Sequence, residues 1–225
     1  KPRRYIHFDT PLKYKDAEQL VIDPVAVAKH AFFPLISFRD RQRRWSKSEG
    51  RWKKKPRPIA YASHTDSHIF AYYAYLLAEE YEQQLETNGI GDVVLAYRKH
   101  VIDPEKSDRG KANFHFAAEA FADIASRPSC EAIALDIKEF FDTIPHRVLK
   151  ANWRWLLGCD ELPPDHYAVY KAVTRFACVP LSQIRASFGI GRRRFKKLRC
   201  INLSTEDFDR LIRSRGIIDT NRRSY

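Results

Sequence analysis

The stretch covering residues 37–62 constrains the fold most strongly. Two segments rich in charged and aromatic residues flank the polar sequence at residues 46–50, which contains Gly50 and favours a turn. The second segment ends in the alternating sequence at residues 57–61, where Ile59 and Tyr61 are apolar. This pattern predicts a long basic β-hairpin, so a purely helical fold is excluded.

Helical periodicity dominates much of the remaining chain. Asp66 is expected to cap an amphipathic helix that ends at Asn88-Gly89, and Asp23-Pro24 predicts a short capped helix. Residues 93–97 are predicted to form a short apolar strand. Asn113 is expected to cap a further helix, with inward-facing apolar side chains at Phe114, Ala117, Ala118, Phe121 and Ile124. The predicted fold class is therefore mixed α/β (α+β).

Positive charge is concentrated in two places. The 40 Lys and Arg residues exceed the 28 Asp and Glu residues, which gives a net charge of +12. Residues 39–57 hold ten of the cations and residues 192–199 hold six. A solvated surface is the plain interpretation of such runs, but aromatic residues such as Trp45 and Trp52 interleave with the charge. That combination is typical of nucleic-acid binding, so nucleic acid is the predicted partner class.

Hydropathy and cysteine spacing predict a soluble protein of a reducing compartment. The longest apolar run, residues 69–78, is shorter than the ~18 residues that a membrane-spanning helix needs. No signal segment opens the chain, so we expect a cytoplasmic protein without membrane contact. The spacing matches neither a zinc ribbon nor a disulfide framework for Cys130, Cys159, Cys178 and Cys200. Because the chain begins at Lys1 and contains no Met, we expect it to be part of a longer protein.

The segment at residues 132–146 is the most informative about chemistry. Its apolar start predicts a buried strand, followed by a tight turn and a helix that begins near Pro145 and ends at Gly158. Asp136 would then lie inside an apolar strand, where an ionised carboxylate needs a cation, a metal or a hydrogen-bond donor. A functional acid and a strand-end turn cap are both consistent with these features. Asp142 is expected to cap the turn.

Residues 135–144 resemble the first catalytic motif in the palm of retron-type and group II intron-type reverse transcriptases. The resemblance implies that Asp136 is the catalytic, metal-ligating aspartate and that the backbone carbonyl of Ile137 assists it in holding Mg²⁺. It also implies that Phe141 is the steric gate that rejects the 2′-hydroxyl group of a ribonucleotide.

Two upstream segments are similar to the fingers motifs of the same family. Lys55-Pro56-Arg57-Pro58-Ile59 fits a Lys-x-Arg-x-Ile pattern, which implies that Arg57 and Lys55 bind the incoming triphosphate. Tyr97-Arg98-Lys99 is similar to the next motif, which implies that Arg98 lies close to the nucleotide. Charge and resemblance together predict the nucleic-acid-binding residues Lys47, Arg51, Lys53, Lys54, Lys99, Arg192, Arg193, Arg194, Lys196 and Lys197.

The resemblance spans residues 37–149 and implies the fingers (37–130) and the first part of the palm (131–225) of a right-hand polymerase, after an N-terminal extension (1–36). It implies an RNA-directed DNA polymerase (nucleotidyltransferase) that uses an RNA template, dNTPs and two Mg²⁺ ions, and a non-coding RNA is a candidate partner. Finer sequence features resemble bacterial defence-associated and abortive-infection reverse transcriptases, which implies antiviral defence. Retron and group II intron enzymes are alternatives.

The template-packing motif and the Tyr/Phe-x-Asp-Asp turn of this family are missing from the sequence. Since two-metal phosphoryl transfer needs several carboxylates, the chain alone is expected to be inactive. A second interpretation starts from residues 195–216, where Ser204 caps a helix that could be the recognition half of a helix-turn-helix. That class of DNA-binding regulator requires a preference for one duplex sequence. Gly189-Ile190-Gly191 is expected to be a loop.

Overall fold

The computed structural model describes residues 5–103, 107–137, 140–189, 201 and 203–221. It contains 49% helix and 15% strand with a mixed sheet, which confirms the predicted mixed α/β class. The helices are α1 (Tyr14–Ile22), α2 (Pro24–Lys29), α3 (His64–Thr87), α4 (Asn113–Ser126), α5 (Phe140–Thr143), α6 (His146–Leu156), α7 (Pro164–Thr174), α8 (Leu181–Ser187) and α10 (Thr205–Phe208), followed by the π-helical turn η1 (Asp209–Arg213). The strands are β1 (Leu35–Ser46), β2 (Arg51–Tyr61), β3 (Val101–Asp103), β4 (Ser107–Gly110), β5 (Ala177–Pro180) and β6 (Asp219–Thr220).

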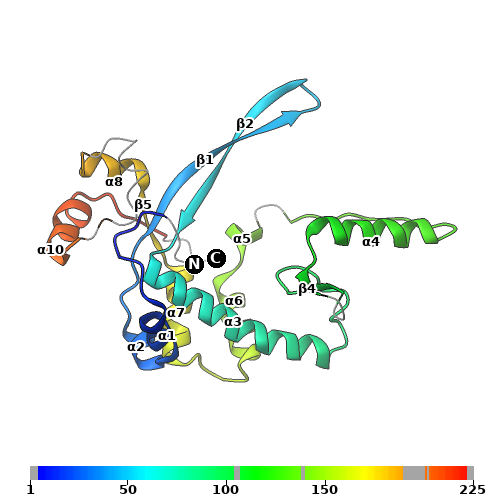
Figure 1. Ribbon diagram of the computed structural model, residues 1–225, viewed down its shortest axis with the longest axis horizontal. Helices are drawn as coiled ribbons and strands as arrows, with labels where there is room; N and C mark the ends of the chain where they lie inside the picture. Colours follow the sequence, from blue (N-terminus) through cyan, green and yellow to red (C-terminus); the bar gives the residue numbers. More distant parts are fainter. Residues whose placement is uncertain (1–4, 104–106, 138–139, 190–200, 202, 222–225) are drawn as a thin grey trace.

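The predicted hairpin is confirmed and forms the longest part of the sheet. Strands β1 and β2 pair antiparallel from Ile36 and Tyr61 at the base to Ser46 and Arg51 at the tip. Strand β5 pairs parallel with β1 only at residues 35–37, and β6 pairs with β5, which gives the order β2-β1-β5-β6. The greater part of the hairpin therefore projects away from the other elements as a two-stranded ribbon (Figure 1).

A buried apolar cluster anchors the base of the hairpin. It consists of Ile6, Phe8, Ile36, Val179, Ile184, Ile201 and Ile212. Three of these residues lie in the predicted N-terminal extension (1–36) and four in the predicted palm range (131–225), so these two ranges share one core, and the partly buried Tyr61 of the fingers range packs against it. The boundaries at residues 36 and 130 stay predictions.

A second cluster holds the helices together. Side chains of α1, α2, α3, α6 and α7 meet around Ile69, Tyr73 and Trp153. The Tyr73 hydroxyl donates to Asp165 Oδ2 at 2.6 Å, and Trp153 Nε1 donates to His166 Nδ1 at 3.2 Å, so the polar atoms of these aromatic residues are satisfied. Asp23 caps α2 by accepting from the backbone N–H groups of the next turn, as predicted.

The N-terminus of α3 differs from the prediction. The N-cap is Ser63, whose Oγ accepts from the backbone N–H of Asp66 at 2.9 Å. Asp66 lies within the first turn and is 1% exposed, where its carboxylate contacts His30 Nε2 at 2.7 Å and accepts from the Phe33 backbone N–H at 2.9 Å. Asp66 therefore ties α3 to the segment before β1. The predicted end of the helix is confirmed, because α3 ends at Thr87 and Gly89 has φ of +62°.

Helix α4 extends away from the rest of the molecule beside the β3-β4 hairpin (Figure 1). The prediction that Phe114, Phe121 and Ile124 face inward is wrong, since α4 buries none of its residues. The predicted cap at Asn113 is also wrong, because the N-cap is Ala112, whose backbone N–H donates to His115 Nδ1. Apolar periodicity sets the apolar face of a helix, but burial of that face requires an adjacent element.

Two predicted strands do not form. Residues 93–97 form turns and irregular backbone, and residues 131–137 have no regular secondary structure. Neither segment pairs with any of the strands in the described part of the chain. A strand is stabilised by hydrogen bonds to its neighbour, so apolar, β-branched sequence alone does not produce one. Pro145 directly precedes α6, and Gly158, with φ of +61°, follows it, as predicted.

Candidate nucleotide and nucleic-acid site

Exposed cations surround the tip of the β1-β2 hairpin. Lys47, Arg51, Lys53 and Lys54 are all exposed. Glu49 in the turn accepts from Arg51 Nε at 2.9 Å and forms an ion pair with Lys53. Ion pairs this exposed contribute about 0–1 kcal/mol, so an incoming phosphate could replace the Glu49 carboxylate at little cost.

The fingers motif lies along β2. Arg57 is exposed and stands opposite Asp40 in the hairpin register. The backbone of Lys55 is part of β2, opposite Gln42. Arg57 is therefore presented on a strand rather than on a loop, which is a suitable support for a group that positions a ligand.

Asp136 is exposed, in contrast to the prediction that it lies in a buried strand. Its neighbours Ile133, Leu135 and Ile137 are 77%, 92% and 66% exposed. The prediction failed because the segment has no strand partner among the described residues. Water can therefore solvate this carboxylate, and its charge does not require a compensating partner within the protein.

The donor atoms at Asp136 have the right chemistry for Mg²⁺ but are too few to hold it. A carboxylate and the Ile137 carbonyl are hard oxygen ligands, whereas Mg²⁺ requires near-octahedral coordination. Within the described part of the chain, no group of three or more His, Cys, Asp or Glu side chains could hold a metal ion.

Two of the predicted motifs meet at an aromatic contact. The rings of Tyr97 and Phe141 have centroids 5.7 Å apart and are nearly perpendicular, at 89°. Both side chains are exposed, Tyr97 by 87% and Phe141 by 66%. An edge-to-face pair of this kind contributes about 0.5–1.5 kcal/mol beyond the area that it buries. The fold thus places the second fingers motif beside the start of α5.

Arg98 is engaged within the protein. Its guanidinium donates to both carboxylate oxygens of Glu82 on α3, at 2.8 Å and 2.6 Å, and to the carbonyl oxygens of Gly91 and Val94. The hydrogen bonds from Arg98 lower the pKa of Glu82, and the same pairing raises the pKa of Arg98. Only 11% of the Arg98 side chain is exposed. A nucleotide-binding role for Arg98 stays a prediction, while Lys99 beside it is exposed.

The Arg98 contacts explain the backbone at Tyr97. Tyr97 has φ of +61°, a left-handed conformation that is uncommon for a residue other than glycine. Because Arg98 joins the loop carbonyls to Glu82, it fixes this turn against α3. Sequence reasoning missed Glu82, since its partner is 16 positions away and no helical spacing connects the two.

The second basic run lies outside the described residues. It contains Arg192, Arg193, Arg194, Lys196 and Lys197, and the predicted loop at Gly189-Ile190-Gly191 falls partly there as well. The Ser204 cap is confirmed, because Ser204 Oγ accepts from the Asp207 backbone N–H at 3.1 Å.

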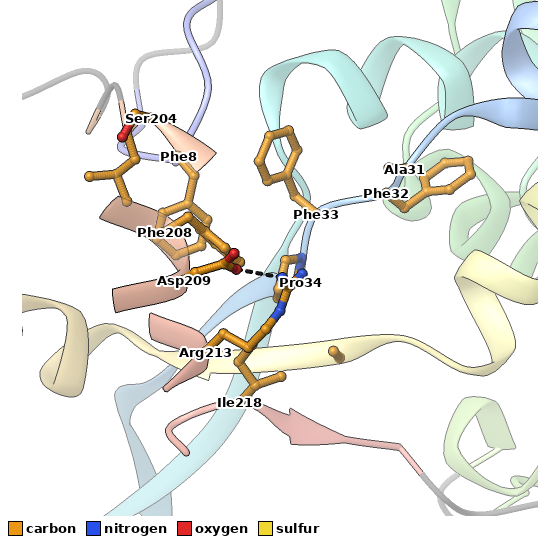
Figure 2. Close-up of a pocket in the computed structure, with 12 residues that line it drawn as sticks. Phe8, Ala31, Phe32, Phe33, Pro34, Ser204, Phe208, Asp209, Arg213 and Ile218 are labelled. Carbon is orange, nitrogen blue, oxygen red and sulfur yellow. Dashed lines mark hydrogen bonds and ion pairs between the residues drawn. The ribbon is translucent and has the colours of Figure 1, made fainter. Parts of the chain in front are cut away.

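Two hollows flank the hairpin base. One, of about 1050 Å³, lies between the hairpin and α8 and includes Arg39, Asp40 and Arg185 in its wall. The other, of about 430 Å³, is shown in Figure 2, where Phe208 and the Asp209–Arg213 ion pair line one side. The hollow in Figure 2 contains none of the motif residues.

The sequence matches no protein-family model and no curated protein. Among the described helices, none is both long and apolar enough to cross a membrane.

Proposed function

We propose that this chain is the fingers and the first part of the palm of a reverse transcriptase that adds dNTPs to DNA on an RNA template. The observation that carries the proposal is the contact between Tyr97 and Phe141. These residues belong to two motifs matched independently in the sequence, and a nucleotide site requires both motifs at one place. Operation in bacterial antiviral defence, in the cytoplasm, is part of the same proposal.

The exposure of Phe141 favours a role in ligand contact. A core aromatic residue would be buried, whereas 66% of this side chain is exposed. Its ring makes edge-to-face contacts with Tyr97 and with Phe140, whose ring centroid lies 5.3 Å away. A supported but accessible ring is what a steric gate beneath the sugar of a nucleotide would need.

The hairpin supports binding of the triphosphate and the template. Arg57, Lys54 and Lys47 are exposed along one continuous ribbon. Cations on such a ribbon attract phosphates without sequence preference, and the attraction weakens as salt rises. Mg²⁺, when bound, would neutralise charge on the triphosphate, and the residues of this chain would orient the nucleotide.

The helix-turn-helix alternative gains no support from the described residues. Ile212, near the end of the segment at residues 195–216, is fully buried in the core at the hairpin base. The described helical part of the segment is the short α10 followed by the π-helical turn η1, whereas a recognition helix lies in the major groove as a regular α-helix.

The test is Asp136→Asn in the complete polymerase that contains this chain. The change removes a metal ligand and keeps the size of the side chain, so DNA synthesis should fall at least about 100-fold while the melting temperature stays unchanged. The matched control is Asp160→Asn, because Asp160 is also an exposed acid outside the motifs. Equal dNTP incorporation by Asp136→Asn and the wild type would rule out the proposal.

A further inference from the structure

The hairpin tip carries a pair of exposed tryptophans. Trp45 and Trp52 are direct cross-strand partners, with ring centroids 5.6 Å apart and an angle of 70° between the rings. They are 48% and 63% exposed, although tryptophan is among the side chains most stabilised by leaving water. The hairpin projects beyond the body of the protein, so nothing in the described fold covers this pair (Figure 1).

Cations share the face of the ribbon that bears the tryptophans. Successive side chains on a strand point to opposite faces, so the pair Arg43 and Lys54, two positions towards the base, lies on the same face as Trp45 and Trp52. Both cations are exposed. Glu49 is the sole acidic residue between positions 41 and 57 in the sequence, so this face is electropositive.

This face is separate from the one that bears Arg57. Trp52 and Arg57 are five positions apart along β2, an odd spacing, so their side chains point to opposite faces of the ribbon. The tryptophan face continues towards the base through Arg39 and Pro58, which line the hollow of about 1050 Å³ beside α8. The surface therefore extends from the tip to this hollow, whose wall also includes Asp40, the cross-strand partner of Arg57.

We propose that Trp45 and Trp52, with Arg43 and Lys54, form a binding site for an unpaired stretch of nucleic acid. The indole rings would stack on bases and the two cations would contact the adjacent phosphates, a combination that recognises single strands without reading their sequence. The proposal deepens the proposed function, on which it rests for the choice of nucleic acid as partner, by naming what the outer face of the hairpin binds.

Charge complementarity favours this occupant over others. A pair used solely to stabilise the hairpin would not need the exposed cations beside it. A membrane surface would also attract tryptophan together with Lys and Arg, so the experiment includes vesicles of anionic lipid. The bases of a duplex are stacked on one another and inaccessible to the indoles, so a blunt duplex should bind through charge alone.

The experiment measures binding of fluorescein-labelled oligo(dT) and oligo(U) to the chain at moderate salt. Trp45→Val and Trp52→Val, which keep a β-branched strand residue, should each weaken binding of both oligomers roughly 10-fold, as expected for the loss of one stacked base. Binding of a blunt duplex should change less than about twofold. Trp155→Leu on α6 is the matched control, because Trp155 is 58% exposed and lies outside the hairpin; it should leave binding unchanged.

A second variant controls for unfolding of the hairpin itself. Trp52→Phe keeps an aromatic cross-strand pair and a stacking surface, so it should bind more tightly than Trp52→Val when circular dichroism shows both to be folded. If the Val variants do not fold, tryptophan emission in Trp155→Leu, which keeps both hairpin tryptophans, tests the proposal instead. Oligo(dT) should quench this emission more than the blunt duplex does.

Three results would overturn this inference. They are equal binding by Trp52→Phe and Trp52→Val, equal loss for single strands and duplex, and binding to vesicles of anionic lipid that oligo(dT) does not displace. Since the assay needs no catalysis, its failure leaves the result of Asp136→Asn unaffected. Conversely, if the complete protein binds single strands through the tryptophans but makes no DNA, the result contradicts the proposed polymerase function and leaves the tryptophan site standing.

Discussion

The base of the hairpin and the segment at residues 131–137 are opposite in packing. At the base, Ile36 and Val179 are fully buried, and Asp66 and Ser63 are buried with hydrogen-bond partners. In the segment that bears Asp136, every residue is exposed. The chain thus builds a packed support at one place and exposes its candidate chemistry at another. Substitutions at the base should therefore change stability, whereas substitutions near Asp136 should change function.

The difference in packing between the two regions is tested most strongly by truncating one apolar side chain in each of them. Ile36→Ala should lower the free energy of unfolding by about 2–5 kcal/mol, because it leaves a cavity in a packed core. Leu135→Ala, at a side chain that is 92% exposed, should change it by less than about 0.5 kcal/mol. Urea unfolding of both variants measures the difference. Similar losses for the two would show that residues 131–137 are packed in solution.

The next largest effect is expected from pH at the same base. Burial, opposed in part by Asp9 and reinforced by His64, lowers the pKa of His7 from 6.5 to about 4. The folded protein therefore binds fewer protons here than the unfolded chain, so the stability from neutral His7 is complete above pH 6.5 and is lost as the pH falls towards 4.

His7→Leu isolates this contribution. The variant should lose less stability than the wild type between pH 6.5 and pH 4, by about 1–3 kcal/mol. Urea unfolding at several pH values measures it. A wild-type stability that stays level over this range would show that His7 is accessible to protons in the folded protein.

A smaller and more local effect is expected at the junction between the two regions. Glu82→Gln replaces a charged partner of Arg98 with a neutral one and should speed amide hydrogen exchange at residues 91–98, with little change in the melting temperature. Glu86→Gln, one turn further along the exposed side of α3, is the control. Unchanged exchange in Glu82→Gln would mean that the carbonyl contacts of Arg98 alone hold Tyr97.

The sequence was informative where local chemistry decides the structure. The polar turn with Gly50, the Asp23 cap, the end of α3 at Asn88-Gly89 and the Ser204 cap depend on neighbours in the chain, and all were predicted. The strands predicted at residues 93–97 and at the apolar start of residues 132–146 do not form, because a strand depends on a partner far away in the sequence.

The features of the candidate site also divide into those that local sequence determines and those that depend on the tertiary fold. The cations and Trp45 and Trp52 could be placed from the alternation of the hairpin, since a cross-strand register follows once the turn is known. The contacts of Arg98 with Glu82 and of Tyr97 with Phe141 could not, because they join segments that only the tertiary fold brings together.

The most direct test of the central claim is the ratio of rNTP to dNTP incorporation by Phe141→Ala in the complete polymerase. Because Phe141 is 66% exposed, the change should leave the melting temperature within about 1–2 °C of the wild type. If the ring excludes the 2′-hydroxyl group, the ratio should rise about 10-fold or more, with a smaller loss of dNTP use than Asp136→Asn causes. An unaltered ratio in a folded, active variant would contradict the assignment of Phe141 to the nucleotide site.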